Sequence, residues 1–556
     1  MLTPEQCQSI CEQHDLYWDG RRGEMRELRN LYMTQFFQHN QPMLDGILRT
    51  EVPKAYAVVE SYLGSLYAKN PAVEVQPDIR GRGNAEVAEA CANQYLLTIR
   101  EQLEDATRLA LIYPSGFCKL APVMGADPLK RVSCAALPPW EVIVDATSSS
   151  WEQQRYVGHV YLMPLLEAAE RYSKSEDELR ARAYSKWIEA ATIAGKDQLM
   201  GLGDPTQTPP EEQWVRVVEL YDMLNDALVV WSPDYANGQA HLFEGVQVQV
   251  GALDPDAEVE HETTGIPYKT ANGRPVVPII PLYFSRDPDT PLRGYSLIRR
   301  SVDQFRELNV MRTYQAQGVR RMARQWMVRA GFLSEDGAAK ISQGLDGEFV
   351  EVDLQPGQPL EGNIMPVPQA PIPADISIYA QTVQNDINEA GLLAPFTRGE
   401  VTKSTATEQQ LLAAYTSSEV GRMARQRDAV ITTIAKTYNI MLSVVLGDEA
   451  EPLSLPNPVG PTILSADDLT GDFSYWAVDA GTTPMSDLAK QQALERLAPL
   501  LLQLGADPQQ VLAELVRTYQ LPESFAEIVE PAPMAPEQGA APLPFPAAGG
   551  MTPEGF

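Results

Sequence analysis

The spacing of apolar residues in the last third of the chain predicts two helices joined by a polar loop. The first helix is expected over Asp375–Leu393, because apolar residues recur there at steps of three and four and so share one helical face. These residues are Ile376, Tyr379, Val383 and Ile387. Pro395 then breaks the pattern, because proline cannot donate the backbone hydrogen bond that a helix interior needs.

The second helix is expected from Thr405 to Leu446 and is the longest element of the chain. Thr405 and Glu408 have the spacing of a capping box, in which each side chain accepts from the backbone N–H of the other residue. One apolar stripe continues along this helix through Leu412, Tyr415, Met423, Val430, Ile434, Tyr438, Met441 and Val445. At 3.6 residues per turn, the stripe corresponds to about eleven turns.

The loop between the two helices, residues 394–404, is polar and is therefore expected to be exposed. The side chains that could act there are Phe396, Thr397, Arg398, Glu400 and Lys403. Phe396 is interpreted either as a wedge at the tip of the loop or as a cap on the helix pair, and the cap is favoured.

Helical periodicity and strand-like alternation follow one another through residues 1–285, which predicts an α+β region within a mainly helical chain. Helices are expected over Thr3–Asn40, Pro53–Ala68, Asn84–Leu111, Pro164–Tyr172 and Glu178–Leu202. Strands are expected over Ala72–Gln76, Phe117–Val123, Arg131–Ala136, Leu137–Asp145, Trp151–Tyr161, Trp214–Met223, Ala227–Trp231, His241–Val250 and Val276–Tyr283. The later strands alternate in the manner of an antiparallel sheet.

Arginine is concentrated between Arg286 and Arg329, where a helix with an apolar stripe is expected from about residue 294. Ten arginines and four acids give this stretch a charge of +6, which leaves −36 for the rest of a chain whose total is −30. Three interpretations stay open: contacts with phosphates, ion pairs with a neighbouring copy, or a solvated helix face. The candidate residues are Arg306, Arg312, Arg320, Arg321 and Arg324.

Residues 325–373 are expected to form a small αβ unit, with strands over Gln325–Ala330, Gly347–Asp353 and Asn363–Val367 and a helix over Glu335–Gln343. After the long helix, Gly447–Pro461 is expected as a loop and Asp472–Val478 as a strand. Two Leu-rich helices are expected over Pro484–Leu504 and Pro508–Gln520. Residues 526–556 are rich in Pro, Ala and Gly, a composition typical of disorder.

The charge of −30 and the pI near 4.6 argue against a protein that wraps the outside of DNA, which needs a positive surface. They do not exclude a duplex that passes through a channel. The N-terminus lacks the pattern of a signal peptide, and no apolar run approaches the roughly 20 residues of a transmembrane helix. The five irregularly spaced cysteines are typical of a reducing compartment.

Cys7, Cys11 and His14 fall on one face of the first predicted helix, because they follow one another at steps of four and three. Thiolate and imidazole ligands at such spacing can hold a metal ion. Buried free thiols are common, however, and no fourth ligand is visible, so burial is the favoured interpretation.

Enzyme motifs are missing at the level of sequence. Ala194-Gly195-Lys196-Asp197 lacks both the first glycine and the Ser/Thr of a phosphate-binding loop. Neither a G-x-S-x-G elbow nor an H-E-x-x-H pair occurs, and the five histidines are scattered. No catalytic residue, metal site or cofactor is therefore expected.

The succession of elements from the arginine-rich helix to the Ser404-Thr405-Ala406-Thr407-Glu408 motif resembles the portal protein of tailed double-stranded DNA bacteriophages. The resemblance covers about residues 1–525 and is strongest over 294–446. It implies a wing (1–285), a first stem helix (286–324), a clip (325–373), a second stem helix (374–393), a tunnel loop (394–404), a long wing helix (405–446), a return to the wing (447–483), crown helices (484–525) and a disordered tail (526–556).

The resemblance also implies a role. Portal proteins form a ring, twelve copies in the virion, at one capsid vertex, and DNA enters and leaves through its channel. Such a ring nucleates procapsid assembly with the scaffold and major capsid proteins, and binds the terminase large subunit and then head-completion or adaptor proteins. The implied place is the virion, after assembly in the host bacterial cytoplasm, without a membrane. The clip candidates for terminase or adaptor contact are Trp326, Arg329, Glu335 and Glu348.

Two other classes of protein remain as alternatives. One is an enzyme of DNA packaging or DNA processing, which would show nucleotide or metal-dependent turnover. The other is a helical scaffold protein without a pore, which would form a monomer or an open array.

Overall fold

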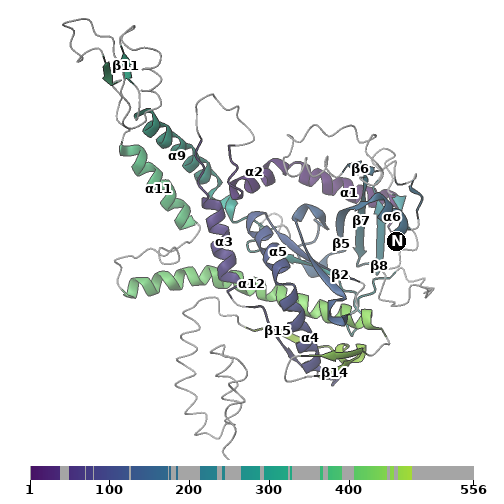
Figure 1. The fold of residues 1–556 in the computed structure, drawn as a ribbon. Helices are drawn as coiled ribbons and strands as arrows, with labels where there is room; N and C mark the ends of the chain where they lie inside the picture. Colours follow the sequence, from purple (N-terminus) through teal and green to yellow (C-terminus); the bar gives the residue numbers. More distant parts are fainter. Residues whose placement is uncertain are drawn as a thin grey trace, which may run out of the picture. The chain divides into compact units, whose positions relative to one another are not determined.

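A computed structural model describes much of the chain up to residue 478 (Figure 1). The described residues are 2–37, 49–68, 70–78, 80–123, 127–172, 174–176, 179, 183–185, 213–233, 241–243, 265–287, 294–322, 326–328, 364–366, 374–390, 406–447, 451–455 and 461–478. The chain divides into two units, Met1–Thr482 and Thr483–Phe556, and every described residue belongs to the first unit.

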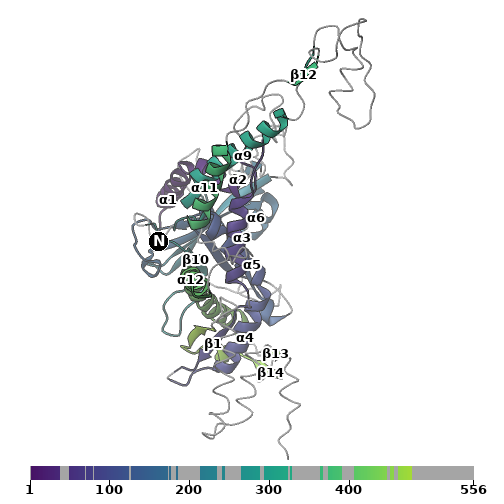
Figure 2. The ribbon, with the colours of Figure 1, turned by 90° about the vertical axis from the view of Figure 1, so that its left-hand side faces the viewer.

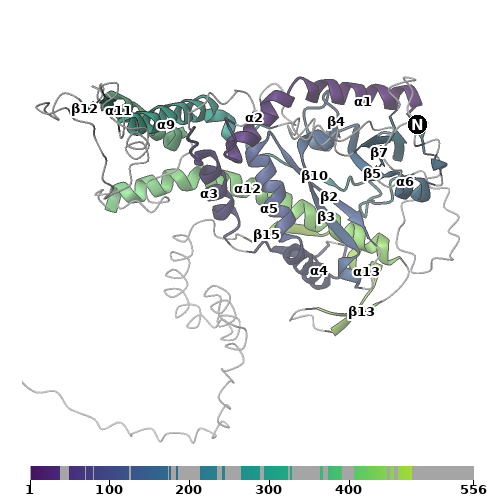
Figure 3. The same cartoon turned by 45° about the horizontal axis from the view of Figure 1, so that its top comes forward.

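The largest sheet has six antiparallel strands in the order β4–β5–β7–β8–β9, with β6 also paired to β7. They are β4 (Val142–Val144), β5 (Tyr156–Pro164), β6 (Ala183–Ser185), β7 (Gln213–Asp222), β8 (Ala227–Ser232) and β9 (His241–Leu242). Because side chains alternate along a strand, Val218 and Leu220 of β7 share one face of the sheet. Helix α1 (Pro4–Asp19) covers that face, where its Cys7 packs in the same cluster (Figure 3).

The opposite face of this sheet packs against a second sheet, in the order β10–β2–β3. Its strands are β2 (Gly116–Pro122), β3 (Val132–Leu137) and β10 (Ile279–Leu282), and Tyr221 of the larger sheet packs in one cluster with Phe117 and Ile279. Helix α5 (Arg100–Ile112) covers the second sheet so closely that a Cβ on Gly116 would lie 2.2 Å from the Ala106 carbonyl oxygen. Only glycine fits at this position.

The main hydrophobic core is helical and has helix α12 (Ala406–Leu446) at its centre. Around it lie α2 (Arg22–Tyr32), α3 (Lys54–Leu66), α4 (Ala85–Thr98), α5 and the two-stranded sheet of β1 (Val73–Gln76) and β15 (Ser474–Ala477). Six α12 side chains are fully buried, namely Met423, Ile434, Ala435, Tyr438, Met441 and Leu442. Tyr438 stacks on Tyr95 of α4 with ring centroids 3.8 Å apart.

Among the described residues, Val420–Leu446 is the one helical segment long and apolar enough to cross a membrane, with a mean hydropathy of 1.5. The sequence analysis expected no such segment. Its apolar side chains pack inside the protein, and a buried core helix meets the same criteria of length and composition. Burial therefore accounts for its hydropathy.

Helices α9 (Val302–Met322) and α11 (Ala374–Ala390) lie side by side in two views (Figures 1 and 2). The short helix η6 (Ile298–Ser301) leads into α9, and the paired strands β11 (Trp326–Val328) and β12 (Ile364–Pro366) follow α9 and precede α11. Remaining described elements are β13 (Glu451–Ser454), β14 (Pro461–Leu464), α6 (Leu165–Arg171), α13 (Ala466–Leu469), η1 (Pro128–Lys130), η2 (Pro139–Glu141) and η3 (Trp151–Gln153).

The mixture of helices and antiparallel sheets confirms the predicted α+β class. Two segments that were each predicted as one continuous helix form two helices in the structure. The first helix divides into α1 and α2 at Gly20–Arg21, and the helix predicted over Asn84–Leu111 divides into α4 and α5 at Ile99. The Thr98 hydroxyl donates to the Tyr95 carbonyl at this second break and so competes with the backbone ladder.

Two further predictions are wrong at particular residues. Ala183–Ser185, expected within a helix, forms β6 because it pairs with the edge of β7. The loop expected over Gly447–Pro461 contains β13, which pairs with β14 in an antiparallel hairpin. In both cases backbone pairing with another strand decides the structure, and local sequence preference does not contain that information. The predictions for residues 186–202, 244–250, 335–353 and 479–556 lie outside the described residues.

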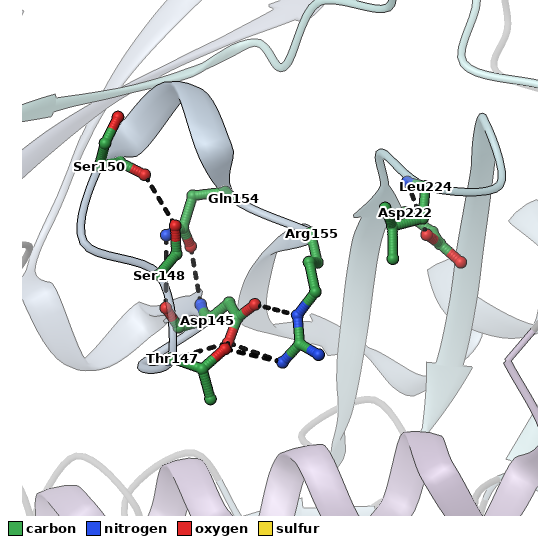
Figure 4. Close-up of polar contacts among 8 residues, drawn as sticks. All are labelled: Asp145, Thr147, Ser148, Ser150, Gln154, Arg155, Asp222 and Leu224. Carbon is green, nitrogen blue, oxygen red and sulfur yellow. Dashed lines mark hydrogen bonds and ion pairs between the residues drawn. The ribbon is translucent and has the colours of Figure 1, made fainter.

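A buried carboxylate fixes the turn between β4 and β5 (Figure 4). Asp145 is 1% exposed, and its carboxylate accepts from Arg155 Nε at 2.5 Å and Nη2 at 3.0 Å. It also accepts from the Thr147 N–H at 3.0 Å and the Thr147 hydroxyl at 2.7 Å. Arg155, and then the Thr147 hydrogen bonds, lower the pKa of Asp145 to about 2 against the cost of burial. Asp222 caps the β7–β8 turn in the same way, by accepting from the Leu224 N–H.

We predict that Asp145→Asn lowers the free energy of unfolding by about 1–3 kcal/mol at neutral pH, because the variant loses the charge that Arg155 pairs with. The pKa of Asp145 is lower in the folded state, so its contribution is present above the unfolded pKa near 4 and is lost as the pH falls toward about 2. Urea unfolding across this range measures both effects.

Asp303→Asn is the matched control, because the Asp303 side chain is 88% exposed and pairs with Arg306 on the same helix. It should change the free energy of unfolding by less than about 0.5 kcal/mol. An equal loss in both variants would contradict a special role for the Asp145 turn.

Candidate functional site

Four of the residues to which the sequence assigns function lie on α9, namely Arg306, Arg312, Arg320 and Arg321. Helix α9, its neighbour α11 and the start of α12 therefore form the candidate site. The inner sides of the helices join the main core through Phe305 and Leu308 of α9 and Val383 and Ile387 of α11. A cross-helix hydrogen bond runs from the Tyr379 hydroxyl to Glu307 Oε1 at 2.6 Å. The pair is therefore a packed unit whose base belongs to the helical core.

The segment before α3 holds α9 in place from a third side. Asn309 Oδ1 accepts from the Val52 N–H at 2.9 Å, and Thr313 Oγ1 accepts from the Thr50 N–H at 3.1 Å. Asn309 and Thr313 are 4% and 8% exposed, so these polar side chains are buried with their partners satisfied. They fix the rotation of α9 about its own axis and thus decide which side chains face outward.

The first arginines of this stretch form ion pairs within the chain. Arg299 pairs with Glu24 of α2, and Arg306 holds Glu27 of the same helix through Nε at 2.5 Å and Nη2 at 2.6 Å. Arg300 Nη2 donates to Ser285 Oγ at 2.8 Å. Because a bidentate arginine–carboxylate pair fixes geometry as well as charge, α2 is held against the start of α9.

This pairing is a fourth interpretation that the sequence analysis did not consider. Glu24 and Glu27 lie three residues apart in the chain and nearly 280 residues before their partners, so local spacing alone could not connect them. The Arg306 side chain keeps an exposed fraction of 46% in the single chain. Arg312 donates to Gln315 Oε1 on its own helix at 3.2 Å.

The outward surface of the helix pair carries apolar side chains. Val310 and Tyr314, one turn apart on α9, are 37% and 60% exposed, and Ile378 on α11 is 64% exposed. Single exposed apolar residues are ordinary, but these belong to two helices that pack together, and α9 also carries the arginines. Burial of these side chains against another protein surface would be favourable, because it removes apolar area from water.

The described residues contain only part of the remaining candidate set. Arg320 and Arg321 lie in the last turn of α9, Trp326 lies in β11 opposite Pro366 of β12, and Glu408 lies in the first turn of α12. Helix α12 begins at Ala406, and the predicted capping box stays a prediction because Thr405 lies outside the described residues. The residues outside the described set are Arg324, Arg329, Glu335, Glu348, Phe396, Thr397, Arg398, Glu400, Lys403 and Thr405.

Cys7, Cys11 and His14 are engaged in packing. Both thiols are fully buried against the sheet, in a cluster with Trp231, and His14 Nε2 donates to the Trp140 carbonyl oxygen at 2.8 Å. Burial, the largest cause, raises the pKa of each thiol to about 12. The part of the chain that the structure describes contains no group of three or more His, Cys, Asp or Glu side chains suited to a metal ion.

Three ionisable side chains meet where the two sheets pack together, a feature that the sequence analysis missed. Lys119 of β2 pairs with Glu219 of β7 and donates from Nζ to His159 Nδ1 at 3.0 Å. Burial, and then the Lys119 charge, lowers the pKa of His159 well below its ordinary value. Lys119 and His159 are each 9% exposed, and Lys119 and Glu219 neutralise each other's charge. The cluster is therefore interpreted as a structural contact between the two sheets.

Comparisons with known proteins leave the family open. No model of a known protein family matches the sequence, and a search of curated proteins gave no match.

We predict that Arg306→Glu weakens the contact between α2 and α9 and that the double variant Glu27→Arg/Arg306→Glu restores it. The expected coupling free energy is about 0.5–1 kcal/mol, because both side chains are partly exposed to solvent. A double-mutant cycle of urea unfolding measures this coupling. Loss of oligomer in Arg306→Glu without rescue by Glu27→Arg would instead place the role of Arg306 between subunits.

We predict that Cys7 and Cys11 resist alkylation in the folded protein, since the thiolate is the reactive form and burial disfavours it. Cys134, which is partly exposed, should react first with iodoacetamide. Peptide mass spectrometry after timed labelling separates the sites, and labelling in urea should modify all five cysteines. Equal rates for Cys7 and Cys134 in the folded state would contradict the packing of α1 on the sheet.

Proposed function

We propose that this chain is a portal protein of a tailed bacteriophage, the ring at one capsid vertex through which double-stranded DNA is packaged and ejected. The observation that carries the proposal is the order of described elements from α9 to α12. An arginine-rich helix is followed by a paired β-unit, a second helix packed against the first, and a helix of 41 residues.

Ring formation gives the helix pair a physical role. A cyclic ring uses two different faces of each subunit and leaves a pore on its axis, so each residue lining the pore becomes a circle of identical residues. The exposed Val310, Tyr314 and Ile378 are suited to burial against a neighbouring helix pair. The arginines beyond Arg306 and the tunnel-loop cations Arg398 and Lys403 are suited to weak contacts with the DNA backbone, which carry no sequence information.

The net charge of −30 supports a channel through which DNA slides rather than a protein that binds DNA tightly. Strong phosphate binding would hold the duplex, whereas a mainly acidic wall with few cations lets it slide. In this proposal the clip binds the terminase large subunit, which supplies ATP hydrolysis, and later the adaptor protein. This chain acts without a cofactor and without catalysis, in twelve copies that assemble with the scaffold and major capsid proteins.

Electron microscopy of the purified full-length chain tests the proposal. Class averages along the particle axis should show a closed ring with a central hole and roughly twelvefold symmetry. A compact small oligomer without a pore would overturn the proposal, and metal-dependent nuclease or ATPase turnover in the same sample would favour the enzyme alternative. Deletion of Val401–Ser404 is a second test of the proposal. The variant should form rings as the unmodified chain does, while DNA packaging or DNA retention falls.

A further inference from the structure

Strand β15 has an edge that no described residue pairs with, and the pattern of hydrogen bonds shows which groups it exposes. In the β1–β15 sheet, Val73 lies opposite Ala477 and Val75 lies opposite Tyr475. The Val73 N–H and C=O point away from β15, because they bond the Asn93 side-chain amide of α4 at 2.7 and 3.0 Å. Both residues of such a pair point outward, so the Ala477 amide groups lie on the outer edge of β15.

The same alternation places the Tyr475 N–H and C=O on the outer edge of β15. Val75, its partner, directs its N–H outward to Glu89 Oε2 at 2.8 Å. Side chains of α4 therefore close the outer edge of β1, while the edge of β15 presents two backbone donors and two acceptors. An uncovered edge of this kind recruits another extended chain.

An open groove of about 770 Å³ runs beside β15. Its walls are β15 itself, the polar side of α12 and the segments around residues 77–80 and 272–276. This volume falls within the range of about 300–1,000 Å³ that is typical of ligand clefts. Trp476, 60% exposed, lies at its rim and offers the large aromatic surface that is common where partners bind tightly.

Two carboxylates and two cations line the groove, and both carboxylates already accept hydrogen bonds within the chain. Asp78 is held by Arg82 Nε at 3.0 Å, and Asp472 accepts from Asn272 Nδ2 at 3.3 Å. The cations Arg80 and Lys436 also line the groove, and no ion pair joins either of them to another described residue. A segment that pairs with β15 and carries carboxylates would satisfy both the backbone edge and these cations.

We propose that the groove beside β15 binds an acidic, extended segment of a second copy of this chain by strand addition. The inference rests on the proposed ring, in which each subunit needs two unlike faces that complement each other, and a strand and an edge are such a pair. Residues 254–262 have the required chemistry in the sequence, because Asp254, Asp256, Glu258, Glu260 and Glu262 occupy every second position. A strand with this alternation carries all five carboxylates on one face.

Photo-crosslinking tests the contact in the full-length assembled protein. The photoreactive amino acid p-benzoylphenylalanine replaces Trp476, and in a control it replaces Leu224, which is 72% exposed on the β7–β8 turn. Irradiation should give chain-to-chain dimers from position 476 and at least about fivefold fewer from position 224. Mass spectrometry should map the crosslink to residues 252–264 of the second copy.

Charge reversal supplies the second arm of the test. Lys436→Glu combined with Arg80→Glu should reduce the dimer yield at least about fivefold, because the carboxylates would then face acids. Lys130→Glu is the charge-matched control, since the Lys130 side chain is 70% exposed and does not line the groove, and it should leave the yield unchanged. Circular dichroism melting of each variant confirms that it is folded.

The outcomes separate this inference from the proposed function. Rings in electron micrographs together with crosslinks confined to one chain, or mapped elsewhere, would overturn the strand contact and leave the ring intact. Equal dimer yields from positions 476 and 224 would also overturn it, since they indicate non-specific association. Absence of rings with specific dimers from position 476 would overturn the portal proposal and retain the edge as an interface.

Discussion

The burial of a mainly apolar helix that also carries polar anchors is the constraint on which the described structure depends. Helix α12 brings Arg427, 3% exposed, into the core, where its guanidinium donates to the Leu66 carbonyl and pairs with Asp428. Asn439, 1% exposed, donates to the Ala88 carbonyl at 3.0 Å and to the Tyr475 hydroxyl at 2.8 Å. Since each anchor is costly to bury without its partners, α3, α4 and β15 have one favourable arrangement around α12.

The candidate site depends on the same core. Arg422 of α12 donates to the Phe284 carbonyl at 2.6 Å, just after β10, and the inner residues of α9 and α11 pack in the cluster that contains α12. The ion pairs of Arg299 and Arg306 then hold α2 against the start of α9. In the proposed ring, a rigid base would keep the outward side chains of α9 and α11 in register between neighbouring copies, which a weak, repeated contact with DNA requires.

The sequence allowed the elements with strong periodicity to be predicted, and α11 and α12 begin within one residue of the expected positions. It did not reveal the break at Ile99, because apolar residues continue across it. The prediction also overlooked Gly20 and Gly23, which interrupt the apolar stripe between Trp18 and Met25. β6 and β13 were missed for a different reason: each is stabilised by a partner strand elsewhere in the chain. The ion pair of Arg306 with Glu27 could not be predicted either, because only the folded chain brings α2 beside α9. Contacts between residues that lie hundreds of positions apart depend on how the whole chain packs, and a local sequence pattern does not contain them.

The contact between Arg427 and Leu66 spans 361 residues and has a consequence for synthesis. A ribosome adding about 5–20 residues per second needs roughly 20–70 s to make that stretch, and for this time the apolar faces of α3, α4 and α5 lack the helix that covers them. The nascent chain is therefore a natural client for chaperones that bind exposed apolar surface. Strand β15 follows α12 in the chain, so its edge is completed later still. In the proposed ring, this order of synthesis would delay association between copies until each subunit has its own core.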